Sequence, residues 1–284
     1  MAKKTRVALI YDFDGTLSVS DMQDFGLIPL LGMKPRDYWP EANKWSNDYK
    51  ADRVTGSMFY FLYKAHEKGV KLTRENFKAC GKNIEYFEGV REWFERISSY
   101  GEILELEVEH YIISAGYEEI IEGSSIRNYF KDVFACSYAF GKEGTPIWPA
   151  RVVNYSAKVQ YISKINKGLN KNDDIGVNEF MPAEKRPIPY TRMIYFGDGY
   201  TDIPCMRTTK EKGGHSIAVY KPHSKSKKEA IKLLTDGRVN FALPADYSEG
   251  RELDNVVKTI LDKIATERDL ELLKAHEEKK KTRK

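Results

Sequence analysis

Short apolar runs rich in β-branched residues predict buried strands at several places along the chain. Residues 6–11 form the first run, which ends abruptly at Asp12, and later runs occupy residues 110–114, 192–198 and 216–220. Segments with helical periodicity lie between them. Strands that alternate with helices indicate an α/β fold, a doubly wound parallel sheet whose ligands bind beyond the carboxyl ends of the strands. We therefore expect the polar residues at these strand ends to converge.

Residues 18–95 break this alternation and predict an inserted domain. Their apolar positions follow helical spacing, as residues 58–65 illustrate. We therefore predict a helical cap at 18–95, set into an α/β core built from residues 1–17 and 96–284. Its aromatic side chains could fill the interior of the cap or contact a substrate. They include Tyr38, Trp39, Trp45 and Tyr49.

Two further segments have signatures of their own. Residues 133–140 and 148–155 read as the arms of a β-hairpin, and residues 141–146 supply its turn. Residues 170–190 contain three prolines and many polar groups, which predicts a long loop.

The composition, 41% apolar and 31% charged in 284 residues, is that of a soluble globular protein. No run approaches the roughly 20 apolar residues of a membrane span, and the N-terminus does not resemble a secretory signal, so we expect no membrane partner. Cys80, Cys136 and Cys205 have neither disulfide-framework nor zinc-ligand spacing, which fits thiols in a reducing compartment. These features predict a cytoplasmic protein.

The net charge of +4 is small beside 46 basic and 42 acidic residues, and it argues against nucleic acid as a partner. Basic residues concentrate at 221–228 and at 279–284, where they fit solvated charge or the binding of a polyanion. Neither run indicates an oligomeric state.

Two carboxylates follow the first predicted strand. Asp12 and Asp14 are two residues apart, and Gly15 behind them allows a turn that would point both into one crevice. One carboxylate could then attack a substrate while the other moves protons. A metal motif of the glycosyltransferase type also has two such aspartates, so the pair alone leaves the reaction open.

A second acidic element, residues 197–202, follows another predicted strand. Its glycines allow a tight turn that exposes Asp198 and Asp202. Carboxylates gathered at one edge of a sheet would repel one another unless a cation joined them, and oxygen ligands suit Mg²⁺. The pattern therefore predicts a Mg²⁺ site.

A phosphoryl group bound there would need hydrogen-bond donors. Ser114 follows a predicted strand that ends at Ile113, and it could offer its hydroxyl together with the backbone amides of Ala115 and Gly116.

The phosphoryl group would also need positive charge. Lys158 could supply it from the start of a predicted helix that Ser156 would cap. Lys142 and Lys164 are the alternative lysines.

With these four elements in order, the sequence resembles the haloacid dehalogenase superfamily, and in particular its phosphoserine-phosphatase-like members. The elements are residues 12–16, Ser114, Lys158 and residues 197–202, which together span about two thirds of the chain. The resemblance implies a phosphatase that forms an aspartyl phosphate, uses Mg²⁺ and carries a helical cap over its site.

The resemblance also implies roles for single residues. Asp12 would be the nucleophile, and Asp14 would protonate the leaving oxygen and then activate water. Asp12, Asp198 and the backbone carbonyl of Asp14 would hold Mg²⁺. Asp202 would support the metal or Lys158, which neutralises phosphoryl charge. The implied phosphate-binding residues are Thr16, Ser114, Ala115, Gly116 and Lys158.

A small phosphorylated metabolite is the substrate class that the resemblance implies. Haloacid dehalogenases usually lack an acid at the position of Asp14, and phosphorylating ion pumps carry threonine there, so Asp14 favours a phosphatase or a phosphomutase. Asp21 stands where serine-specific relatives place a glutamate that reads the substrate's ammonium, although it could instead cap a helix. Thr201 departs from those relatives, which commonly have asparagine there.

Two other classes stay open beside the metabolite phosphatase. The basic runs keep a phosphatase or binding protein for a nucleotide or nucleic-acid phosphate as the alternative. A catalytically silent scaffold that binds a phosphorylated ligand is the other.

Overall fold

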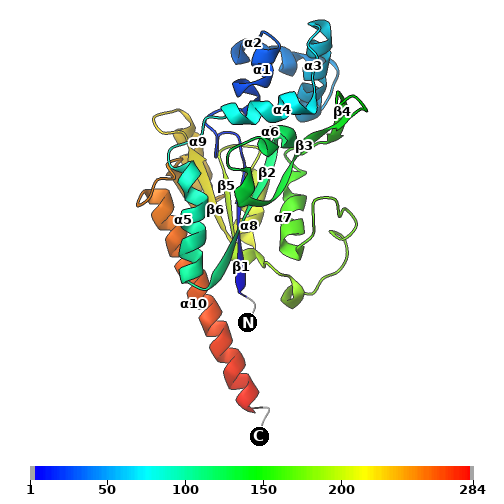
Figure 1. Cartoon of the computed structure of the whole chain (residues 1–284). Helices are drawn as coiled ribbons and strands as arrows, with labels where there is room; N and C mark the ends of the chain where they lie inside the picture. Colours follow the sequence, from blue (N-terminus) through cyan, green and yellow to red (C-terminus); the bar gives the residue numbers. More distant parts are fainter. Residues whose placement is uncertain (1–3, 282–284) are drawn as a thin grey trace.

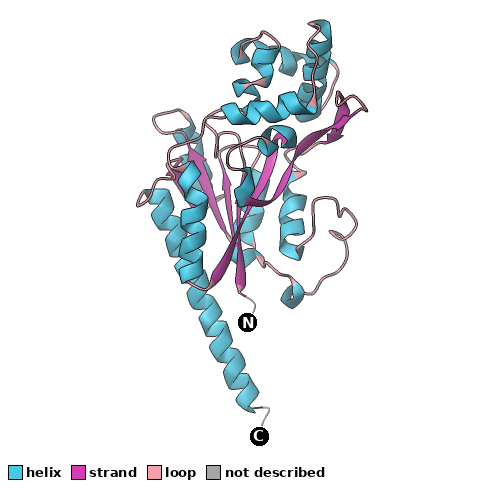
Figure 2. Ribbon diagram, in the orientation of Figure 1, coloured by secondary structure: helices cyan, strands magenta, loops and turns pink. Residues whose placement is uncertain are grey.

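The computed structural model describes residues 4–281, which fold around one seven-stranded sheet with helices on both faces (Figures 1 and 2). The strands lie in the order β4-β3-β2-β1-β5-β6-β7, and all neighbours are parallel except β3 and β4. The strands are β1 (Thr5–Tyr11), β2 (Leu106–Tyr117), β3 (Phe130–Phe140), β4 (Pro146–Arg151), β5 (Met193–Gly197), β6 (His215–Tyr220) and β7 (Phe241–Pro244). The predicted doubly wound α/β sheet is confirmed.

The helices cover both faces of this sheet, with α5 and α10 on one face and α7 and α8 on the other (Figure 1). The α-helices are α1 (Leu27–Leu30), α2 (Pro35–Asp48), α3 (Arg53–Glu67), α4 (Arg74–Cys80), α5 (Val90–Ile103), α6 (Glu118–Glu122), α7 (Lys158–Lys167), α8 (Ile203–Glu211), α9 (Ser226–Thr235) and α10 (Glu252–Lys281). Short 3₁₀ turns occur at η1 (Met22–Phe25), η2 (Gly81–Asn83), η3 (Arg127–Tyr129), η4 (Ala183–Lys185) and η5 (Tyr190–Arg192).

Strand β1 lies in the middle of the sheet, which explains its unbroken apolar run. Its last five residues, Val7 to Tyr11, are completely buried because helices cover both faces. Leu9 is paired with His110 of β2 on one side and with Ile194 of β5 on the other. The carboxyl ends of β1, β2 and β5 therefore lie side by side, as expected from the polar strand ends.

Helix α5 packs against β2 through an apolar stripe. Val90, Trp93, Phe94 and Ile97 form the stripe at helical spacing, and all four are fully buried. Burial of each such side chain contributes roughly 1.5–3 kcal/mol. The predicted cap boundary at residue 95 falls inside this helix, which packs on the sheet, so we propose that the insertion ends before Val90.

Helices α1 to α4 lie beyond the carboxyl ends of the strands (Figure 1). The two connections to them, residues 17–19 and 85–87, run antiparallel and are hydrogen-bonded to each other. Gly89 ends the second connection with a φ of 76°, and a Cβ there would lie 2.4 Å from the backbone nitrogen of Ser248. Any larger residue would strain the backbone and collide with the loop that follows β7.

Strands β3 and β4 form the predicted hairpin, but its second arm is displaced. Pairing ends at Arg151, which is opposite Ser137, instead of continuing to residue 155. The chain turns away at that point because the residues that follow lead into α7, and the amide of Lys158 donates to the carbonyl of Asn154.

The hairpin also reaches the helical insertion. The Tyr138 hydroxyl donates to the carbonyl of Met58 at 3.0 Å, and the Arg74 amide donates to the carbonyl of Gly144 at 3.0 Å. The Arg74 guanidinium lies 4.2 Å from the centre of the Phe140 ring. The insertion is therefore held to the core at a second place, apart from its two chain connections.

Residues 169–189 form the predicted long loop, and this described segment holds only the short turn η4. Lys167 anchors it, because its Nζ donates to the carbonyls of Gly176 at 3.2 Å and Val177 at 2.6 Å.

Between residues 4 and 281, no helix combines the length and apolar character needed to cross a membrane. Helix α10 extends past the sheet (Figure 1), and its distal leucines Leu270, Leu272 and Leu273 are exposed. The lysines of the basic run 221–228 are exposed as well. Residues 282–284, at the end of the other basic run, lie outside the described residues. The three cysteines are buried and unpaired, as predicted.

Candidate active site

The chain turns sharply where β1 ends, which fixes the first carboxylate of the site. The Asp12 amide donates to the carbonyl of Phe196 at 2.9 Å, and the Phe13 amide donates to Asp12 Oδ1 at 2.7 Å. Gly15 has a φ of 70°, and a Cβ there would lie only 2.3 Å from Asp198 Oδ2. Glycine is thus required for the first acidic motif to approach the second.

Asp14 points instead toward the start of the helical insertion. Its Oδ1 accepts the backbone amide of Met22, the first residue of η1, at 2.8 Å and the Ser18 hydroxyl at 3.4 Å. Asp21 occupies the N-cap position of η1, but its side chain caps no amide in the described chain. The capping interpretation of Asp21 is therefore wrong, and Asp14 holds the amide of this turn.

Lys158 lies between two of the aspartates. Its Nζ is 2.9 Å from Asp12 Oδ2 and 2.8 Å from Asp202 Oδ1, and the lysine side chain is fully buried. Lys158 is the first residue of α7, and the predicted Ser156 cap is wrong. The helix begins one residue later than predicted, with Ala157 at its N-cap position, and the side chain of Asn154 accepts the amide of Ala157 at 3.0 Å.

Asp202 is held on several sides and is completely buried. Besides Lys158, its Oδ1 accepts the hydroxyl of Tyr195 at 2.7 Å, and its Oδ2 accepts the Thr201 hydroxyl at 3.3 Å. One ligand oxygen each from Asp12, Asp198 and Asp202 can be chosen so that all lie within 4.8 Å of one another. Asp202 thus contacts the lysine and also belongs to the acidic cluster.

The alternative lysines lie elsewhere. Lys164 is buried on α7, where it donates to Asp174 Oδ1 at 2.6 Å, and Lys142 is in the turn of the hairpin. Of these three lysines, the structure brings only Lys158 to the aspartates.

Burial and neighbouring charges raise the pKa values of three aspartates at the site. Burial raises the pKa of Asp12 well above its usual range, and Asp202 and Asp198 add to this effect while Lys158 opposes it. Burial followed by the charges of Asp21 and Asp12 raises the pKa of Asp14 well above its usual range. Burial and Asp202 raise the pKa of Asp198 to about 7.

Lys158 behaves in the opposite sense. Burial by itself lowers the pKa of this lysine, but the charges of Asp12 and Asp202 outweigh burial and raise the pKa above its ordinary value. The lysine is therefore held in its charged form at neutral pH.

The acidic cluster fits a bound Mg²⁺. Three carboxylates converge within reach of one small ion, and one lysine cannot neutralise all of them. The raised pKa values of Asp12 and Asp198 show that ionising these carboxylates together is unfavourable without additional positive charge. All donors are oxygen atoms, which Mg²⁺ prefers.

The structure agrees only in part with the expected phosphate-binding arrangement of Thr16, Ser114, Ala115 and Gly116. Ser114 is fully buried, and its Oγ accepts the amide of Gly116 at 2.9 Å, so this amide does not face a ligand as expected. The Thr16 hydroxyl is buried and has no partner among the described residues. Ala115 lines the cavities described next.

Strand β2 continues to Tyr117, past the predicted end at Ile113. Its pairing with β3 is irregular between these two residues. Ser114 to Gly116 therefore form a bulge inside a strand rather than a loop after it, which re-aims the backbone at this point.

Two adjoining cavities open at this edge of the sheet. The inner one, of about 400 Å³, is lined by Asp12, Asp14 and Asp198 together with Asp21. The outer one, of about 220 Å³, shares Asp14 and Asp21 and continues between core and helical insertion. Its other lining residues are Gln23, Trp39, Asn43, Arg53, Val54, Ser57, Ala115, Tyr155 and Thr201.

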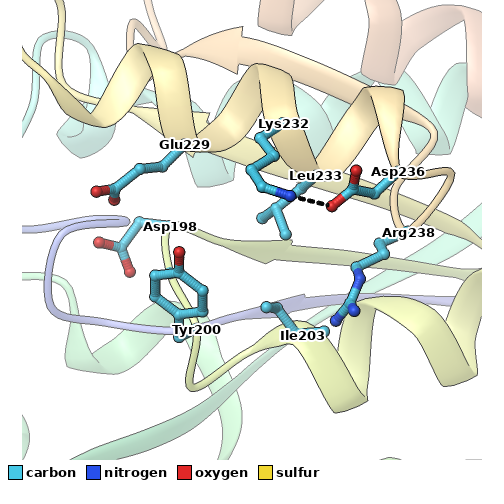
Figure 3. A pocket seen from close by; sticks show the side chains of 9 residues that line it. Asp198, Tyr200, Ile203, Glu229, Lys232, Leu233, Asp236 and Arg238 are labelled. Carbon is cyan, nitrogen blue, oxygen red and sulfur yellow. Dashed lines mark hydrogen bonds and ion pairs between the residues drawn. The ribbon is translucent and has the colours of Figure 1, made fainter.

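A third hollow, of about 230 Å³, lies between the Gly197–Asp202 turn and α9 (Figure 3). Asp198 and Tyr200 line it, facing Leu233 of α9 and the ion pair between Lys232 and Asp236. Asp12 and Asp14 are not part of its lining, so this hollow does not contain the two carboxylates of the first motif.

Several residues around the site were not expected from the sequence. Tyr195, which anchors Asp202, is two residues before Gly197 on an otherwise apolar strand, and that spacing places both on one face. Nothing in the sequence around Gln23 and Arg53 indicates that they line a cavity, because the helical insertion meets the core only through long-range packing. Of the four aromatic residues expected in the insertion, Tyr38 is buried in the core cluster and Trp45 packs against it, whereas Trp39 lines the outer cavity and Tyr49 is exposed.

Fold and motif order together define a class of protein. Residues 9–207 match the family model of haloacid dehalogenase-like hydrolases, and the chain belongs to this family. The resemblance read from the sequence is thereby confirmed.

A curated relative from Borreliella burgdorferi, itself an uncharacterized protein, is 28% identical and the match covers 91% of this chain and 96% of the relative. Among solved structures, a HAD family hydrolase from Salmonella enterica serovar Typhi has a TM-score of 0.57 at 15% identity, covering 90% of this chain and 71% of its own. A substrate-bound phosphoserine phosphatase has a TM-score of 0.54 at 18% identity, and the match covers 90% of this chain and 99% of the phosphatase chain. These structural likenesses show the shared fold.

Proposed function

We propose that this hydrolase is a Mg²⁺-dependent phosphatase that acts on a small phosphorylated metabolite through an aspartyl phosphate on Asp12. The observation that carries the proposal is that Asp12 and Asp14 both line the inner cavity. Lys158 Nζ lies 2.9 Å from Asp12 Oδ2. A nucleophilic carboxylate and an acid of raised pKa are thus available to the same substrate.

In the first step, a carboxylate oxygen of Asp12 bonds to phosphorus and the ester bond to the leaving oxygen breaks. Asp14 donates its proton to that oxygen, so the product leaves as an alcohol. In the second step, Asp14 takes a proton from a water molecule whose oxygen attacks phosphorus. The bond to Asp12 then breaks, which releases inorganic phosphate and restores the carboxylate.

Other residues support these steps. Lys158 would keep Asp12 ionised and neutralise charge on the phosphoryl oxygens, and Asp202 would hold the lysine in place. Asp12, Asp198 and the backbone carbonyl of Asp14 would hold Mg²⁺, which supplies further charge for the phosphoryl group. Ser114 can still donate its own hydroxyl proton to a phosphoryl oxygen, because its Oγ only accepts from Gly116.

The cavities favour a small leaving group. The outer cavity of about 220 Å³ is closed on one side by the helical insertion, which we propose as the cap. Arg53 is the one cationic side chain among the described residues that line the two site cavities. A nucleic-acid partner needs several cationic contacts to phosphates, so we favour a metabolite over the nucleotide or nucleic-acid alternative.

The test is hydrolysis of an aryl phosphate with Mg²⁺ by the wild type and by Asp12→Asn. We expect the variant to fold and to be inactive, and mass spectrometry of acid-quenched wild type to find a phosphoryl group on the Asp12 peptide. Asp132→Asn is the control, because Asp132 also accepts the amide of its following residue, at 2.8 Å, but lies on β3. Turnover by Asp12→Asn at the wild-type rate would refute the proposal.

A further inference from the structure

The third hollow, beside α9, holds two charged side chains that no other described residue neutralises. Arg238 lines it, and its guanidinium forms no hydrogen bond or ion pair within residues 4–281. Glu229 lines it as well, and its carboxylate has no partner in that part of the chain (Figure 3). By contrast, Lys232 and Asp236 pair with each other at 2.8 Å and need no ligand.

The two unpaired charges lie at opposite ends of the hollow (Figure 3). Glu229 is in the first turn of α9, whereas Arg238 follows the end of that helix at Thr235. A helix rises about 1.5 Å per residue, so the two ends are on the order of 10 Å apart. A ligand that meets both charges must therefore be elongated.

The lining between the charged ends is apolar. Ile203 of α8 and Leu233 of α9 face each other across the hollow, and the ring of Tyr200 stands beside them (Figure 3). An aliphatic chain laid over these side chains would remove apolar surface from water. A water molecule occupies about 30 Å³ in the liquid, so the volume of about 230 Å³ holds roughly eight non-hydrogen atoms.

We propose that this hollow binds a small elongated zwitterion whose carboxylate meets Arg238 and whose ammonium group meets Glu229. The aliphatic chain between them lies across Ile203 and Leu233. A guanidinium presents its donors in a planar fork that matches a carboxylate, so the anionic end fits Arg238. Asp12 does not line the hollow, and the binding site is therefore independent of the proposed phosphatase chemistry.

Asp198 places this binding site directly beside the acidic cluster. It lines both the hollow and the inner cavity, as Tyr200 does. Within the hollow it lies on the side of Glu229, where it adds negative charge at the end that receives the ammonium group (Figure 3). A bound zwitterion would thus contact the loop that contributes a carboxylate to the cluster.

The test compares three six-carbon probes that differ only in their charged ends, namely 6-aminohexanoate, hexanoate and hexylamine. In a methyl NMR titration of the wild type, 6-aminohexanoate should bind about fivefold to tenfold more tightly than either of the others. The methyl resonances of Ile203 and Leu233 should shift during the titration. Those of Ile103, which is exposed on α5, should not.

Two variants separate the two ends. Arg238→Met should weaken 6-aminohexanoate and hexanoate alike, by about fivefold to tenfold, whereas Glu229→Gln should weaken only 6-aminohexanoate. Arg36→Met is the control, because Arg36 is exposed on α2 and does not line the hollow, and it should bind as the wild type does. All three positions are exposed, so the variants should fold, which circular dichroism checks.

Three results would overturn the proposal: no saturable binding of 6-aminohexanoate, equally tight binding of hexylamine, or unchanged binding of 6-aminohexanoate in either variant. None of these measurements uses turnover. A protein that binds the zwitterion but hydrolyses no phosphate would refute the proposed function alone.

Discussion

Lys158 Nζ lies 2.9 Å from Asp12 Oδ2, and both side chains are almost completely buried. Lys158→Met leaves Asp12 and Asp202 without a compensating charge, so we expect a loss of about 3–5 kcal/mol in the free energy of unfolding. Turnover of an aryl phosphate should fall by at least about a hundredfold. Denaturant unfolding and steady-state kinetics measure the two effects.

Lys164→Met is the matched control, because Lys164 is also buried on α7 but pairs with the exposed Asp174. This variant should retain the wild-type kcat. Equal losses of kcat in both variants would contradict the assignment of Lys158 and point to a general effect on α7.

The acidic cluster predicts a metal requirement. Exhaustive chelation should abolish turnover and Mg²⁺ should restore it, whereas Ca²⁺, which prefers more ligands at longer distances, should support the reaction poorly. Binding also stabilises the folded state, by about 2.7 kcal/mol at a hundredfold excess over Kd, so Mg²⁺ should raise the Tm of the wild type.

Asp198→Asn should remove most of this Mg²⁺-dependent rise in Tm. Asp246→Asn, which alters an aspartate that pairs with Arg251 outside the cluster, should leave the rise unchanged. Full activity after chelation would exclude the proposed metal chemistry.

Asp21 predicts a preference for amine-bearing phosphates. Asp21→Ala should lower kcat/KM for such a substrate by about 1.5–3 kcal/mol more than for a neutral aryl phosphate, because a charge-assisted hydrogen bond is lost. The residue keeps part of its surface in contact with solvent, but its carboxylate lines both cavities, where burial and the charge of Asp24 raise its pKa to about 6. The preference should therefore weaken as the pH falls through about 6. Equal losses on both substrates would indicate a role in folding or in the cap.

His110 predicts a pH dependence of stability. It is buried between the hydroxyls of Tyr11 and Ser98, each 3.1 Å away, and burial lowers its pKa to about 4 from the ordinary 6.5. Between pH 6.5 and about pH 4, the imidazole is protonated in the unfolded chain but stays neutral in the folded protein. The free energy of unfolding therefore decreases as the pH is lowered through this range. This histidine should account for roughly 2 kcal/mol of lost stability between pH 7 and pH 5.

The measurement is urea unfolding at pH 7 and pH 5. His110→Gln removes the titrating group, so the difference in unfolding free energy between the two pH values should shrink by that amount. The exposed His66, replaced in the same way, is the control. A difference unchanged in His110→Gln would show that other groups cause the acid sensitivity.

Much of the core was predictable because its signals are local. A buried strand between two neighbours needs an uninterrupted apolar run, and residues 6–11 show one directly before Asp12. The turn that brings Gly15 against Asp198 Oδ2 needs a residue without a Cβ, so the glycine is visible in the sequence. The hairpin could be predicted for the same reason, although its second arm ends four residues early, at Arg151.

The rest depended on contacts between segments far apart in the chain. Helical periodicity in residues 90–103 does not say whether α5 covers the sheet or belongs to the insertion, because only packing on β2 separates these cases. The bulge after Ile113 likewise follows from the pairing of β2 with β3.

The amino-acid sequence by itself determined which carboxylates gather at the site, since Asp12, Asp14 and the Gly197–Asp202 turn directly follow strands and are specified locally. Only the tertiary structure decided which residues line the outer cavity. Gln23 and Arg53 come from separate parts of the insertion and meet Asp14 across one cavity, and neither has a neighbour in sequence that reveals this. The physical reason is that a cavity is formed by long-range packing, whereas strand ends and turns are specified by the few residues that form them.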